Sequence, residues 1–350
     1  MRLTNQHRQE KRLLVFNCHE PWVCQLSVLG YSLDIITGLP GHHRRGWDTR
    51  FRPIPPLSRL ISLEQAKNTS TQYYCIITHN ITDLLDIKAR PEPRILMLHL
   101  SVEARVTEEK ATVDPRRLRR MLRHYLSWMG VHAVAVTESK GLSWGLSTDI
   151  VNAGVNAQDY APNTGERACA LRVCNFMKRR KQFVHWDFHQ AAFGDLPVQI
   201  IGYNPGIPGA MPSRSWDHLR QLLRTHRFYI HTAKPALEDG YNMATLEAMA
   251  AGLPVLGNEH PTSPIQHGRD GFLSDDPQAL HAYAHMLLED RPLALHMGQE
   301  ARRTVLERFS QDKFRRTMMQ SIETARQKHQ QRIQQLAHLC PIPNTLELAV

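Results

Sequence analysis

The sequence lacks long apolar segments. None of the uncharged apolar runs in its 350 residues approaches the roughly 18–20 residues needed to cross a bilayer. The first apolar stretch, LLVF at 13–16, is too short for the core of a signal peptide, and Asn17, His19 and Glu20 follow it at once. We therefore expect a cytoplasmic protein.

The sequence also lacks the usual patterns of metal sites and disulfide frameworks. Its six cysteines form no Cys-x-x-Cys pair and no zinc-finger spacing with histidine. Its twenty histidines are scattered, and no His-Glu-x-x-His helix is present. We expect reduced thiols, no metal and no cofactor; the cysteines are Cys18, Cys24, Cys75, Cys169, Cys174 and Cys340.

Acidic residues are fewer than basic ones, 33 against 43, which leaves a formal net charge of +10. This balance suits an acidic partner: nucleotide phosphates, nucleic acid or an anionic membrane surface. No RNA- or DNA-binding motif is present, so we do not expect nucleic acid. With 42% hydrophobic and 22% charged residues, the composition is that of an ordinary globular protein.

The first half of the chain alternates strand-like and helical patterns. Asp114 and Pro115 cap a helix over 115–129, where apolar residues recur at helical spacing. Strands separated by helices favour a parallel sheet with crossover helices. The expected strands are 13–16, 73–78, 94–98 and 131–136, and a second helix is expected over 22–36.

The second half repeats this alternation, so the fold class is α/β with two doubly wound units. The boundary falls near 152–165, a stretch rich in Asn, Gly, Pro and Asp. We expect domains over 1–155 and 156–325 and a polar tail over 326–350. The strands expected here are 171–176, 198–202, 228–232 and 254–257, and the helices are 214–225, 243–251, 277–289 and 293–308.

The segment DGYNMATLEAMAAGLPVL, residues 239–256, closely resembles the signature of family 4 glycosyltransferases. In that family an acid in a loop leads into a helix that carries a second acid. Here the acids are Asp239, where the family usually has Glu, and Glu247. The start of such a helix suits a diphosphate, and Glu247 is placed to accept hydrogen bonds from a ribose. The expected donor contacts at this start are Gly240, Tyr241, Asn242 and Met243.

The resemblance extends over residues 149–310, because segments 149–160, 260–273, 276–280 and 307–310 also match the family's pattern. Over 1–148 it rests only on strand order and a few polar strand ends. It implies the GT-B architecture, in which two Rossmann-like domains face each other across a cleft. It further implies retaining, metal-independent transfer of a sugar from a nucleotide sugar to a glycan, lipid-linked or other acceptor.

A basic turn at 173–181 departs from the family's pattern. The family commonly places an Arg and a Lys there to neutralise the leaving diphosphate. This chain has Asn175 and Arg180 at those positions, with Lys181 as a further cation. Because Asn175 carries no charge, an alternative function is a binding protein of the same fold that holds nucleotide or glycan without turnover.

The remaining candidates follow from the resemblance. Asp239, with Glu238 beside it, would contact hydroxyls of the donor sugar, and Lys234 would contact phosphate, unless it is simply a surface lysine. His99 ends a strand where the family often has a histidine facing the sugar. His99, Asp239 and Arg180 are thus the candidate catalytic residues.

His19, Glu20 and His79 are candidate acceptor contacts, although each histidine could equally be a hydrogen-bonded structural residue. The arginine-rich helix at 116–123 and the basic loop 41–52 could meet an anionic membrane or an acidic glycan, or could form a solvated charged face.

Overall fold

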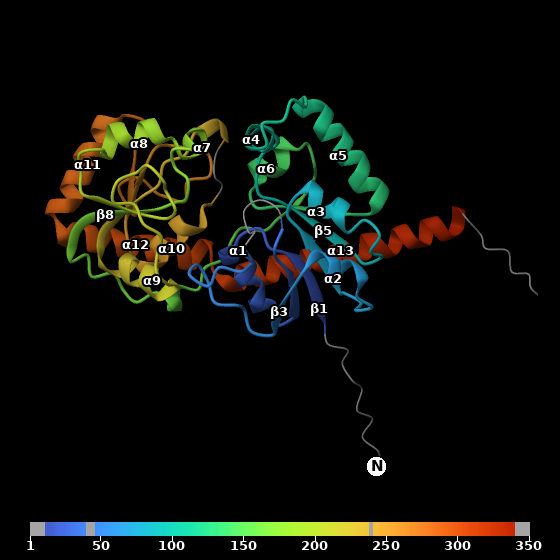
Figure 1. Ribbon diagram of the computed structural model, residues 1–350. Coiled ribbons are helices and arrows are strands. Elements are labelled where there is room, and N and C mark those ends of the chain that lie inside the picture. The colour runs from blue at the N-terminus through green and yellow to red at the C-terminus, as the bar shows by residue number, and fades with distance from the viewer. Residues whose placement is uncertain (1–10, 40–45, 238–240, 340–350) are drawn as a thin grey trace, which may run out of the picture.

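A computed structural model describes residues 11–39, 46–237 and 241–339. It contains two α/β units, each built on a parallel sheet (Figure 1). This confirms the predicted pair of doubly wound units.

The first sheet has seven strands in the order β3-β2-β1-β4-β5-β6-β7, and every pairing is parallel. The chain builds outward from β1 on one side and then continues from β4 on the other, so a topological switch point lies between β1 and β4. The strands are β1 Arg12–Phe16, β2 Ser32–Ile36, β3 Ser58–Ile61, β4 Cys75–Thr78, β5 Arg94–Leu98, β6 His132–Ala135 and β7 Asp149–Ile150.

The second sheet has five parallel strands in the order β12-β11-β10-β8-β9, which places its switch point between β8 and β10. The strands are β8 Arg167–Val173, β9 Val198–Ile201, β10 His226–Ile230, β11 Val255–Gly257 and β12 Gly271–Leu273.

Helix α5 forms where its capping residue predicts it. Asp114 accepts hydrogen bonds from the backbone amides of Arg116 and Arg117 at the start of α5, as its sequence indicates. The helices of the first half are α1 Glu20–Cys24, η1 Gln25–Leu29, α2 Leu63–Asn68, α3 Ile81–Asp86, α4 Val102–Glu108, α5 Pro115–Met129, α6 Glu138–Ser143 and η2 Ala157–Asp159. Those of the second half are α7 Lys181–Val184, α8 Trp186–Phe193, α9 Trp216–Thr225, η3 Pro235–Leu237, α10 Met243–Ala251, α11 Pro277–Glu289, α12 Arg291–Arg308 and α13 Gln311–Leu339.

The helix predicted over 22–36 is wrong in its second part. Helical structure ends at η1, where Gly30 adopts a φ of 70°, and Ser32–Ile36 forms β2. Every residue of β2 is buried. A strand covered on both faces is apolar without alternation, so its pattern does not distinguish it from a buried helix.

Helix α13 is 29 residues long and contains the first part of the predicted polar tail. It leaves the second unit and runs along the first one (Figure 1, red). Arg326 donates to the carbonyl of Tyr74 at 3.1 Å, and Lys328 Nζ lies 2.8 Å from His132 Nδ1. The chain therefore returns to its first unit; the buried apolar face of α13 consists of Phe314, Met318, Ile322 and Ala325.

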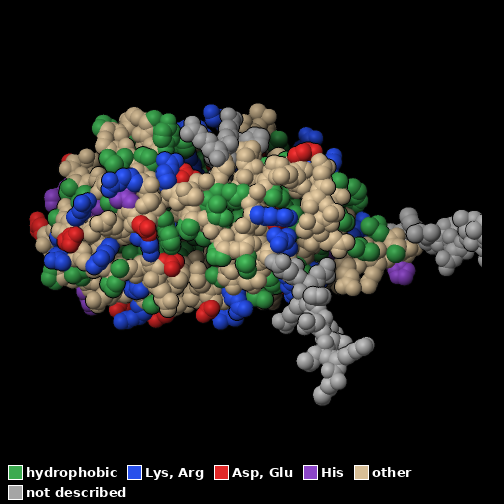
Figure 2. All heavy atoms as spheres, turned by 60° about the horizontal axis from the view of Figure 1, so that its bottom comes forward, with side chains coloured by type: hydrophobic (Ala, Val, Ile, Leu, Met, Phe, Trp, Pro, Cys, Tyr) green, Lys and Arg blue, Asp and Glu red, His purple; other side chains and the backbone are tan. Residues whose placement is uncertain are grey.

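Charged side chains of both signs are spread over the surface in Figure 2, with Lys and Arg on both units and acidic groups among them. Among the described residues, we find no helix with both the length and the apolar character of a membrane span.

Candidate functional site

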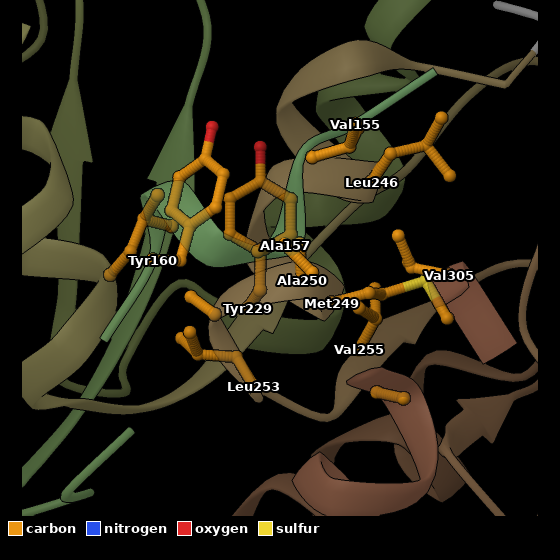
Figure 3. Packing of buried hydrophobic residues seen from close by; sticks show 14 of the residues in the cluster. Val155, Ala157, Tyr160, Tyr229, Leu246, Met249, Ala250, Leu253, Val255 and Val305 are labelled. Carbon is orange, nitrogen blue, oxygen red and sulfur yellow. The ribbon is translucent and has the colours of Figure 1, made fainter. Parts of the chain in front are cut away.

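Helix α10 lies at the centre of the second unit's core. The side chain of Asn242 accepts a hydrogen bond from the amide of Thr245 at 3.1 Å, which fixes the start of the helix. Gly252 ends it with a φ of 89°. Figure 3 shows Leu246, Met249 and Ala250 packed among residues of α12 and the interdomain segment. This packing makes α10 a rigid platform for the residues on it.

Glu247, on this helix, forms an ion pair with Arg52 of the first unit. Both side chains are buried, with 4% and 7% exposure. Arg52 also donates to the hydroxyl of Tyr160 at 3.4 Å, and its guanidinium lies 4.7 Å from the ring centre of Trp216. Burial raises the pKa of Glu247, and the charge of Arg52 opposes that rise. Four distant parts of the chain thus meet at the Arg52 guanidinium.

The loop that carries Arg52 is fixed by Glu20. The Glu20 carboxylate is fully buried and accepts hydrogen bonds from the amide of Asp48 at 3.2 Å and from Asn17 Nδ2 at 3.3 Å. The indole of Trp47 donates to the carbonyl of Arg52 at 2.8 Å. Glu20 thus positions the loop, and the acceptor contact predicted for it stays a prediction.

His19, the other member of the predicted acceptor pair, is exposed at the start of α1. The structure therefore separates the environments of the two residues. Only His19 faces solvent, where an acceptor could reach it.

Three of the predicted phosphate contacts lie in the basic turn after β8 and in the segment after β10. The guanidinium of Arg180 lies 5.4 Å from the ring centre of Phe183. The exposed Lys181 begins α7, and the amide of Lys234, also exposed, donates to the carbonyl of Phe183 at 3.0 Å. The Arg180 guanidinium thus lies beside Phe183, and the backbone of Lys234 joins the end of β10 to the same residue.

Asn175 has a structural contact in this turn. Its side-chain oxygen accepts a hydrogen bond from the amide of Tyr203 at 2.7 Å, and the next residue, Phe176, adopts a φ of 54°. Asn175 therefore joins the turn after β8 to the end of β9.

Arg172 is a buried residue that the sequence analysis did not identify. It donates to Thr232 Oγ1 at 2.7 Å and to the carbonyl of Val184 at 3.0 Å, and it lies 2.9 Å from His189 Nδ1. These contacts fix the ends of β8 and β10 under the basic turn. The only signal for it in the sequence is a charged residue inside an apolar strand.

Two of the predicted site residues, His79 and His99, meet at the carboxyl ends of the first sheet's strands. His79 Nδ1 lies 2.8 Å from His99 Nε2, and the edge of Trp22 contacts both rings at centroid distances of 4.7 and 5.2 Å. Burial lowers the pKa of His79 to about 3 and holds the pKa of His99 well below its usual value. Both imidazoles are therefore neutral at pH 7.

The predicted contacts before α10 are described only in part. Glu238, Asp239 and Gly240 lie outside the described residues. Tyr241 packs edge-on against Phe309 at 4.7 Å, and Met243 Sδ lies 3.8 Å from Gln25 Nε2 of the first unit. The start of α10 therefore faces the first unit.

Residues 204–290 match the sequence model of the family described as "Glycosyl transferases group 1". A curated relative, the N-acetyl-alpha-D-glucosaminyl L-malate synthase of Bacillus anthracis, is 36% identical over 81 residues, which are 22% of this chain. The match spans only 21% of that relative's length.

Two solved structures resemble nearly the whole chain. Sucrose-phosphate synthase from Thermosynechococcus elongatus has a TM-score of 0.63 and 15% identity, with 94% of this chain and 100% of that chain covered. The Anabaena protein HepE, solved with UDP and glucose, has a TM-score of 0.67 and 12% identity, with 90% and 99% covered. The chain has the GT-B fold of two Rossmann-like domains, and its residues 204–290 carry the pattern of group 1 glycosyltransferases.

Proposed function

We propose that the protein is a retaining, metal-independent glycosyltransferase. It transfers a sugar from a nucleotide donor to a glycan, lipid-linked or other acceptor. The observation that carries this proposal is the position of Glu247 on α10, inside the matched segment and facing the first domain. A buried carboxylate at this place can accept two hydrogen bonds from a ribose diol.

Three cations, Arg180, Lys181 and Lys234, would supply the other half of the donor site. Glycosyl transfer passes through an oxocarbenium-like state while negative charge grows on the leaving diphosphate. Arg180, Lys181 and Lys234 stand at the carboxyl ends of β8 and β10, where ligands bind in doubly wound sheets. They would stabilise that charge together with the positive end of α10. Asp239 and Glu238 would contact the sugar's hydroxyls, and His99 would approach the sugar from the first domain.

Arg52 forms an ion pair with the Glu247 carboxylate, which is the group that the ribose would need. We expect nucleotide binding to exchange the Arg52–Glu247 pair for hydrogen bonds from the ribose. Because Arg52 belongs to the first domain, this exchange would loosen one contact between the domains.

The alternative is a binding protein without turnover. It is favoured by Asn175, whose side chain holds Tyr203 and carries no charge for the diphosphate. The two functions differ in turnover but not in nucleotide binding.

The test is a panel of UDP-, GDP- and ADP-sugars, assayed for binding by thermal shift and for donor hydrolysis or transfer. UDP-glucose should be tried first, because the similar Anabaena protein was solved with UDP and glucose. Binding with turnover supports the transferase. Tight binding without turnover supports the alternative, and the absence of any binding contradicts both.

We also propose that α5 contacts an anionic membrane surface. Met121 and Trp128 are 56% and 61% exposed on this helix, and Arg117 and Arg120 are exposed beside them. Exposed apolar groups flanked by arginines suit a lipid interface. Binding to vesicles with phosphatidylserine, but not to neutral vesicles, would support this contact, and Trp128→Ala should weaken it.

A further inference from the structure

Three residues with metal-binding side chains meet at the switch point of the first sheet. Cys18 lies two residues after β1, and His79 and His99 directly follow β4 and β5. One ligand atom from each residue lies within 4.8 Å of the other two. The sequence spreads these residues over 82 positions, so no spacing motif reveals them. Only the order of the strands brings them together.

We propose that Cys18, His79 and His99 bind one thiophilic divalent cation, with Zn²⁺ as the best match. One thiolate and two imidazoles are a typical ligand set for Zn²⁺, which keeps a fourth position open when a protein supplies only three ligands. Harder cations such as Mg²⁺ and Ca²⁺ prefer oxygen ligands and fit this set poorly.

The two histidines need only a small adjustment, whereas Cys18 Sγ, within 4.8 Å of the histidine ligand atoms, would move closer to them as a Zn–S bond of about 2.3 Å forms. The two facing imidazole nitrogens are 2.8 Å apart. In a tetrahedral site with Zn–N bonds of about 2.0–2.1 Å, they would be about 3.3 Å apart. A separation of roughly half an ångström therefore exchanges the hydrogen bond between the histidines for two metal bonds.

The surroundings hold the ligands in place. Asp83 accepts a hydrogen bond from the amide of His79 at 2.8 Å, which fixes the turn after β4. The edge of Trp22 restricts both rings. Burial keeps both imidazoles neutral. When a cation binds, the ring that donates the hydrogen bond between the histidines moves its proton to its other nitrogen, so that both facing nitrogens present a lone pair.

Burial also raises the pKa of the Cys18 thiol, and the charge of Asp83 adds to this rise. The thiol is therefore protonated when no cation is bound. On binding, the S–H bond breaks, the sulfur forms a bond to the cation, and the proton leaves to solvent. No oxidation or reduction takes place.

A cation here would engage the nitrogen of His99 that faces His79. We therefore infer that Zn²⁺ inhibits sugar transfer, since His99 would no longer be free to approach the donor sugar. This consequence rests on the proposed function. Binding of the cation does not rest on it.

The binding test uses Co²⁺ as a spectroscopic probe of the full chain, freed of metal by a chelator. Wild type should take up one Co²⁺ and show a thiolate-to-cobalt charge-transfer band in the near ultraviolet, which Zn²⁺ then removes. The absence of this band in wild type overturns the proposal, whatever the variants do.

Cys18→Ser should lose the band, and Cys169→Ser should keep it. Cys169 is a matched control because it is a partly exposed thiol in β8 of the other domain. The opposite pattern contradicts the proposal. If Cys18→Ser does not fold, blocking of the Cys18 thiol by a maleimide in wild type, located by peptide mass mapping, should be slowed by Zn²⁺, while blocking of Cys169 should not. Equal slowing at both thiols, or none, overturns it.

Inhibition is measured separately. Micromolar Zn²⁺ should lower the transfer rate of wild type at least tenfold and leave Cys18→Ser almost unaffected. If Co²⁺ binds as expected but no donor is turned over, the transferase proposal fails while the metal site stands. If donors are turned over but the cobalt band is absent, the metal site fails while the transferase proposal stands.

Discussion

The two domains have the same kind of switch point but different side chains around it. In the first domain, between β1 and β4, a thiol and two neutral imidazoles lie in buried or partly buried surroundings. In the second, between β8 and β10, the partly exposed Arg180 and the exposed Lys181 stand on a turn, and a buried carboxylate lies on α10. The same kind of switch point therefore creates the position in both sheets, and the residues after each strand determine which ligand it suits. The carboxyl end of the second sheet suits phosphate and ribose, whereas that of the first sheet suits a neutral group or a thiophilic cation.

The contact between the domains gives the largest expected effect. Arg52→Met leaves Glu247 buried without its partner and should lower the free energy of unfolding by about 3–5 kcal/mol. Arg50→Met is the control, because Arg50 forms an exposed pair with Asp48 in the same loop and should cost less than about 1 kcal/mol. Urea unfolding measures both. The double variant Arg52→Met/Glu247→Gln should recover most of the loss, and purely additive losses would mean that the pair is not coupled.

The second prediction concerns the cations of the second domain. Arg180→Ala should slow sugar transfer by about 2–4 kcal/mol, roughly 30- to 10³-fold, because one donor to the developing diphosphate charge is lost. Arg224→Ala, an exposed arginine at the end of α9, should leave the rate unchanged. Steady-state rates at saturating donor decide this. A normal rate for Arg180→Ala would remove it from the site.

The third prediction tests whether the fold of the first domain keeps His79 uncharged. The pKa of His79 is depressed in the folded protein to about 3, from about 6.5 when unfolded. The unfolded chain therefore binds more protons below pH 6.5, and stability is lost as the pH falls. Between pH 7.5 and 5, this residue should account for about 2 kcal/mol of that loss.

His79→Gln should therefore lose less stability over this range than wild type, while His285→Gln, an exposed histidine of α11, should behave like wild type. Unfolding curves at several pH values measure the difference. Parallel curves for wild type and His79→Gln would show that His79 is not held neutral by the fold.

The smallest expected effect concerns the caps of two helices in the second domain. Asn242→Ala and Ser215→Ala each remove a hydrogen bond to a first-turn amide and should each cost about 1 kcal/mol of stability. Only Asn242→Ala should also weaken nucleotide binding, because only α10 receives the diphosphate in the proposed site. Equal nucleotide affinity in both variants would place the diphosphate elsewhere.

Local patterns were enough to predict much of the second domain. Helix α10 has its small residues, its cap Asn242 and its end at Gly252 within one continuous segment. In contrast, the ion-pair partner of Glu247 is Arg52, which lies 195 positions away in the chain, and no local pattern connects the two. The meeting of His79 and His99 and the return of α13 to the first domain likewise depend on tertiary packing. β2 was missed because burial on both faces removes the alternation that identifies a strand.

The central claim is that a nucleotide sugar binds over α10 with its ribose on Glu247. The most direct test is calorimetric titration with the nucleoside diphosphate whose sugar performs best in the donor panel. The proteins to titrate are wild type, Glu247→Gln and the exposed control Glu166→Gln. We predict tight binding to wild type and control and at least tenfold weaker binding to a folded Glu247→Gln. Equal affinity in all three would contradict the account.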